Sequence, residues 1–136
     1  MPTKIPIWVS AIVIVGAVLM AAGAIIAEVN PQMLVAPNAT INTATHVYAA
    51  YLVSRNLVLA VMLLAALAWR AKPVLHTLLV AVAFIQIADA VLDALEGRWP
   101  LVPGVFVLGI LFFIAAARIS GAAFWKRAAW SAVHPT

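Results

Sequence analysis

The stretch that decides the fold reads VYAAYLVSRNLVLAVMLLAALAW, from Val47 to Trp69. Its apolar length suits the roughly 20 residues that a helix needs to cross about 30 Å of hydrocarbon. Arg55 nevertheless lies well inside this stretch. A charged side chain within a membrane span is costly and usually faces a partner or a cavity, so the residues opposite Arg55 become the first candidates for a site.

Three further apolar runs accompany this stretch, and together the four cover most of the chain. The predicted spans are residues 5–27, 47–69, 74–95 and 101–123. None of them alternates as barrel strands do, and only helices and closed barrels satisfy the backbone in lipid. The first run exceeds the apolar region of about 7 to 15 residues in a secretory signal, which favours a first span. The sequence therefore predicts a single all-α domain over residues 1–136, a bundle of four transmembrane helices.

Composition supports a membrane protein and excludes several other classes. The 136 residues are 67% hydrophobic and only 9% charged, whereas charged residues make up about a quarter of a soluble domain. With no cysteine, disulfides, thiolate metal sites and thiol catalysis are excluded. The basic residues stand singly or in pairs at the ends of apolar runs, a pattern that anchors helices and does not indicate nucleic acid as a partner.

The connections predict how the helices run. The short connections RAKP and EGRWPLVPG require antiparallel neighbours. The positive-inside rule then places both termini in the cytoplasm, as expected for a multi-pass protein of a bacterial inner (plasma) membrane. The predicted inner side holds Lys4, Arg70, Lys72, Arg118, Lys126 and Arg127, and the outer side holds Arg98.

Two features of the predicted inner side were assigned to the membrane interface. The tail FWKRAAWSAVHPT is expected to extend the fourth helix along the membrane surface. The ring of His76, just after Pro73, is expected to lie at the same interface.

The helical rise per residue gives the depth of each charged residue in its span, and these depths identify a partner for Arg55. Arg55 lies about eight residues, or roughly 12 Å, inside the second span. Asp89 lies about six residues, or roughly 9 Å, before the outer end of the third span. Because these spans are sequential and antiparallel, the two charges come to similar depth, and the sequence predicts an ion pair between them.

Further polar residues lie at helical spacing around this pair, in the outer half of the bundle. They predict a polar pocket formed by Tyr48, Tyr51, Arg55 and Asn56 on the second span and by Gln86, Asp89 and Asp93 on the third. The pair of Arg55 with Asp89 either fixes helix register or belongs to a site. Asp93 is a second carboxylate near the same arginine, and this excess carboxylate indicates a functional role. The alternative is that Asp93 reaches interfacial water or Arg98.

The motifs YLVSRNLVLA and QIADAVLDA resemble the DoxX-like group of small four-helix bacterial membrane proteins. In that group a proline-containing loop follows the first helix, an arginine lies on the second and an aspartate on the third. Pro31, Arg55 and Asp89 match these positions. Asn56 and Ala60 stand where the closest branch has an acid and a glycine. The resemblance implies the four-helix fold and no particular activity.

Three functions fit these features. The first is binding of a small lipophilic molecule in the pocket, with conversion by proton transfer as an option: isomerisation, cyclisation, epoxide opening or hydrolysis. Asp89 or Asp93 would then be acid or base, Arg55 would hold a carboxylate or oxyanion, and Tyr51 or Asn56 would donate a hydrogen bond. No cofactor or metal is expected. The second is an accessory subunit of a larger membrane complex or homo-oligomer within the lipid, and the third is a small transporter.

Overall fold

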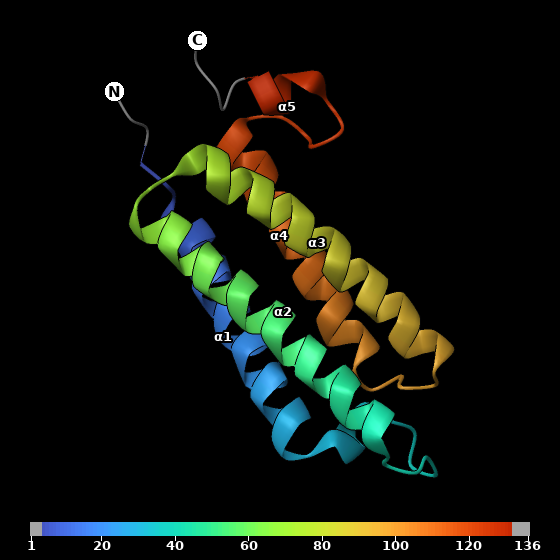
Figure 1. Cartoon of the computed structure of the whole chain (residues 1–136). Helices are drawn as coiled ribbons and strands as arrows, with labels where there is room; N and C mark the ends of the chain where they lie inside the picture. Colours follow the sequence, from blue (N-terminus) through green and yellow to red (C-terminus); the bar gives the residue numbers. More distant parts are fainter. Residues whose placement is uncertain (1–3, 132–136) are drawn as a thin grey trace.

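The computed structural model describes residues 4–131, and four long helices account for most of them (Figure 1). The helices are α1 (Ile7–Val29), α2 (Thr43–Ala68), α3 (Lys72–Leu95) and α4 (Val102–Ser120), with a 3₁₀ turn η1 (Pro31–Leu34) and a short α5 (Arg127–Ser131). Each of the four long helices is long and apolar enough to cross a membrane. The prediction of an all-α fold with four helices able to span a membrane is confirmed for the described part of the chain.

Local capping explains where two of these helices differ from the predicted spans. α2 begins earlier than predicted because the Asn42 side chain accepts a hydrogen bond from the Thr45 amide at 3.0 Å, half of a capping box. α4 ends earlier because Gly121 takes a left-handed conformation, with φ of 74°. A short polar side chain thus sets the start of α2, and a glycine sets the end of α4. The hydropathy pattern alone marks neither position.

The four long helices associate as two pairs. α1 packs mainly on α2, and α3 mainly on α4, while the two pairs touch each other less. In Figure 1 the start of α1, the turn between α2 and α3 and the end of α4 lie at one end of the bundle, here called the terminal end. The connections between α1 and α2 and between α3 and α4 lie at the opposite, distal end.

The packed core lies in the half of the bundle nearer the terminal end. The largest fully buried side chains are those of Phe112, Leu63, Leu75, Leu79, His76, Val9, Val13 and Val82. A Cβ at Gly16 would overlap the ring of Phe112, so α1 and α4 meet there only because Gly16 has no side chain. Close packing therefore holds the two pairs together on this side, and the buried apolar residues of the distal half are mostly alanines.

Two predictions for the terminal end are wrong. His76 is only 1% exposed, and its Nδ1 donates to the carbonyl oxygen of Ala116 at 3.1 Å. Its ring meets that of Trp130 edge to face, with centroids 4.9 Å apart. The described part of the tail does not extend α4, because the left-handed Gly121 turns the chain and α5 brings Trp130 against α3. Residues 132–136 of the tail lie outside the described residues.

Candidate functional site

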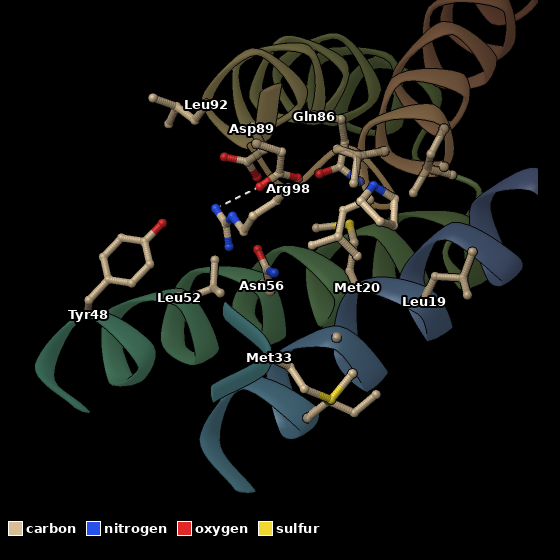
Figure 2. Close-up of a pocket in the computed structure, with 18 residues that line it drawn as sticks. Leu19, Met20, Met33, Tyr48, Leu52, Asn56, Gln86, Asp89, Leu92 and Arg98 are labelled. Carbon is tan, nitrogen blue, oxygen red and sulfur yellow. Dashed lines mark ion pairs between the residues drawn. The ribbon is translucent and has the colours of Figure 1, made fainter. Parts of the chain in front are cut away.

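A cavity of about 460 Å³ opens between the two helix pairs in the distal half of the bundle (Figure 2). This volume lies within the range of pockets that hold small organic molecules. One wall is apolar and comes largely from α1 and α4, with Met20, Gly23, Val105 and Leu108 among its residues. The polar side chains of the lining come from α2, from α3 and from Arg98, which follows α3.

Most of the predicted polar residues meet at this cavity. Tyr48, Asn56, Gln86, Asp89 and Asp93 all line it. On α2, the lining positions 48, 52 and 56 are spaced four apart, so they form one stripe along the helix. Of the four α2 residues predicted to form the pocket, Tyr48 and Asn56 lie on this stripe, and Tyr51 and Arg55 do not.

Tyr51 and Arg55 lie one position before the lining residues of α2 and so are rotated about 100° away from them. Tyr51 is 74% exposed and does not line the cavity. Arg55 also lies outside the lining stripe, but its long side chain reaches α3. Of these two predicted site residues, only Arg55 therefore contacts the polar wall.

The predicted ion pair between Arg55 and Asp89 is present. Nη2 of Arg55 donates to Oδ2 of Asp89 at 2.7 Å, and Nη1 donates to Oδ1 at 3.4 Å. Both oxygens of Asp89 are thus engaged by one guanidinium, the bidentate geometry that arginine and carboxylate favour. The pair joins α2 to α3, and so links the two helix pairs across their weaker contact.

A second ion pair covers the distal end of the same wall. Nη2 of Arg98 lies 2.7 Å from Oδ1 of Asp93 and 3.0 Å from Oε2 of Glu96. The dashed line in Figure 2 marks its pair with Asp93, on the cavity side. Asp93 consequently has its own arginine and does not share Arg55 with Asp89.

The turn that ends α3 brings Arg98 to this position. Gly97 has φ of 75°, the Gly97 amide donates to the Ala94 carbonyl at 3.2 Å, and the Arg98 amide donates to the Asp93 carbonyl at 2.7 Å. These two bonds form a Schellman motif, which returns the second residue after the helix over the last turn. The sequence signal was Glu96-Gly97-Arg98, and it could have identified Arg98 as a lining residue.

Two side-chain amides line the cavity: Asn56 beside Arg55, and Gln86 one turn below Asp89 on α3. Gln86 is 8% exposed and lines the cavity, and no other described residue forms a hydrogen bond with its side chain. Asn56 accepts from Nε of Arg55 at 3.2 Å through its Oδ1. In Figure 2 the two amides project into the cavity from facing helices. They offer hydrogen-bonding groups to whatever the cavity holds.

The cavity lining reaches the protein surface on two sides: at Tyr48 of α2 and Leu92 of α3, and between α1 and α4, which have few contacts with each other. Leu19 and Ile26 of α1 and Leu101 at the start of α4 line the cavity and are also exposed.

Within residues 4–131, no three histidine or acidic side chains gather in a way that could hold a metal ion. The arrangement instead combines apolar volume, two neutralised carboxylates and two amides, which suits binding and orientation of an organic molecule. Comparison with protein-family models, curated proteins and solved structures finds no match for the chain.

Proposed function

We propose that this membrane protein binds a small lipophilic molecule in the distal cavity. The observation that carries the proposal is Gln86, a polar side chain 8% exposed that lines an otherwise largely apolar cavity without a hydrogen-bond partner among the described residues. The amide atoms of Gln86 are open to the cavity and not sealed in the core, so the hydrogen-bond partner that a largely buried polar group normally has must come from the cavity. A bound molecule would supply that partner, whereas a purely structural bundle gains nothing from the amide.

The orientation of the protein belongs to the same proposal. Lys4, Arg70, Lys72, Arg118, Lys126 and Arg127 all lie at the terminal end, and the described acidic residues lie toward the distal end. The positive-inside rule then puts the terminal end in the cytoplasm of a bacterial cell. The cavity would open to the outer leaflet of the plasma membrane, between α1 and α4.

A second candidate function is conversion of the bound molecule by proton transfer. Asp93 lines the cavity and pairs with Arg98 through Oδ1, while no other described residue bonds to its Oδ2. That oxygen could exchange a proton with a ligand, as an isomerase or hydrolase of this kind requires. Asp89 fits a positioning role better, because Arg55 engages both of its oxygens.

Carbene labelling tests whether the cavity takes up lipophilic molecules. The purified protein is irradiated with adamantyl diazirine, and labelled peptides are mapped by mass spectrometry. We expect labelling of the cavity residues Met20 and Leu108 to fall at least several-fold in Gly23→Phe, because Gly23 lines the cavity and a Cβ there meets nothing within 4 Å.

The matched control is Ala22→Phe, which adds the same ring at an exposed neighbour that does not line the cavity. It should leave labelling of Met20 and Leu108 unchanged. Equal labelling in the wild type, Gly23→Phe and Ala22→Phe would mean that the cavity does not admit the probe, and the proposed function would be wrong.

A further inference from the structure

We infer that the bound molecule is an uncharged carbonyl compound whose oxygen accepts hydrogen bonds from Asn56 and Gln86 at the deep end of the cavity. This inference rests on the proposed function and names the class of ligand. Three observations carry it: the fixed orientation of one amide, the burial of the other, and the arginine partner that each lining carboxylate already has.

The Arg55 side chain fixes which end of the Asn56 amide faces the ligand. Because Nε of Arg55 can only donate, the atom of Asn56 that it meets at 3.2 Å must be the oxygen, Oδ1. The other end of the amide is then Nδ2, a donor. A ligand group beside Asn56 must therefore be a hydrogen-bond acceptor.

Gln86 supplies the second hydrogen-bond donor, and its position shows how deep in the cavity the ligand oxygen would bind. It lies one turn below Asp89 on α3, or roughly 5 Å farther from the distal end. The cavity residues Met20 and Leu108 are buried at this end, and the packed core closes it below. Nε2 of Gln86 can donate to an acceptor there, and a carbonyl oxygen has two lone pairs, which matches the donors of Asn56 and Gln86.

Each carboxylate that lines the cavity already has a guanidinium partner, which disfavours a charged ligand. Asp89 pairs with Arg55 and Asp93 with Arg98, so each lining carboxylate has a guanidinium within 2.7 Å. An anion would approach two carboxylates, and a cation would have to displace an arginine from one of them. In a site with little water, either arrangement costs more than binding a neutral group.

The remainder of the molecule would be hydrocarbon. From the amides to the opening, the wall formed by α1 and α4 presents Leu19, Gly23, Ile26, Leu101 and Val105. None of these side chains can satisfy a polar group, so the ligand carries its polarity at the end that enters first.

Four probes with matched chains test the inference: 2-dodecanone, dodecane, dodecylamine and dodecanoate. Each is added to the full-length protein in detergent, and retention is measured by native mass spectrometry over a concentration series. We expect the wild type to retain 2-dodecanone about tenfold more strongly than dodecane, as one to two net hydrogen bonds would give. Both charged probes should be retained less than the ketone.

Variants locate the effect at the two amides. Gln86→Leu and Asn56→Leu should each lower retention of 2-dodecanone by about three- to tenfold and leave retention of dodecane unchanged or higher. Gln32→Leu makes the same change at an exposed residue of η1 and should alter neither. Thermal unfolding of each variant checks that it folds. If one variant does not fold, the other variant and the wild-type probe series still test whether the ligand is a carbonyl compound.

The outcomes separate this inference from the proposed function. Equal retention of ketone and alkane, preference for a charged probe, or an unchanged ketone preference in Gln86→Leu and Asn56→Leu would overturn the carbonyl assignment while leaving the cavity as a binding site. Failure of all four probes to bind, together with unchanged carbene labelling in Gly23→Phe, would overturn both.

Discussion

At the scale of single residues, two ion pairs lie one turn apart on α3 and differ in burial. The side chains of Arg98 and Asp93 are 12% and 9% exposed, whereas those of Arg55 and Asp89 are 37% and 26% exposed. Removing one partner of a buried pair leaves the other charge uncompensated, at a cost of about 3–5 kcal/mol. Glu96 still pairs with Arg98 when Asp93 is replaced. We therefore expect Asp93→Asn to lower the free energy of unfolding by the lower end of that range, about 3 kcal/mol, and Asp89→Asn by less, about 1–2 kcal/mol.

Reversible unfolding in mixed micelles measures both variants. Pairing Asp93→Asn with Arg98→Gln completes a double-mutant cycle, in which the second change should recover part of the loss. Equal costs for Asp93→Asn and Asp89→Asn would show that burial does not set the strength of these pairs.

The sequence predicted the pair of Arg55 with Asp89, because helix rise and antiparallel order fix their depth without any knowledge of rotation about the helix axis. Rotation is what the sequence left open. Tyr51 was assigned to the pocket by spacing from Tyr48 and Arg55, but α2 turns positions 48, 52 and 56 toward the cavity. Arg98 was placed on the outer side and named only as one alternative partner of Asp93, because hydropathy does not describe how a helix ends. The resemblance to the DoxX-like group stays a prediction.

At the scale of helices, two glycines of α1 should respond in opposite ways to the same substitution. A Cβ at Gly16 would overlap the ring of Phe112, whereas a Cβ at Gly23 meets nothing within 4 Å. Gly16→Ala should therefore destabilise the protein by about 1–3 kcal/mol through overpacking. Gly23→Ala should be neutral or stabilising by up to about 1 kcal/mol, because alanine favours helix.

The measurement is again unfolding in mixed micelles, and the added variant Phe112→Leu should relieve Gly16→Ala by removing the ring. A loss of stability in Gly23→Ala as large as in Gly16→Ala would contradict the contact between α1 and α4. Neither effect could be predicted from the sequence, where both glycines are simply small residues in an apolar run. Which of them faces another helix depends on the pairing of helices, and that is a property of the fold.

At the scale of the whole molecule, the proposed orientation can be read with introduced cysteines, since the chain contains none. Thr40 lies in the exposed connection between α1 and α2, and Ser131 is exposed at the end of α5. We expect a membrane-impermeant maleimide to label Thr40→Cys in intact spheroplasts and to label Ser131→Cys only after lysis. Labelling in the reverse order would invert the orientation and place the cavity in the inner leaflet.

In the proposed function, a ligand enters from hydrocarbon between α1 and α4, and this route determines what occupancy of the cavity depends on. A molecule that enters there has already left water on dissolving in the bilayer. Moving its chain from the bilayer into a cavity lined by leucines therefore exchanges one apolar environment for another. Acyl chains of ordinary lipids compete for the same space. Occupancy therefore follows the mole fraction of the ligand in the membrane, and adding lipid at a fixed amount of ligand would empty the cavity by dilution alone.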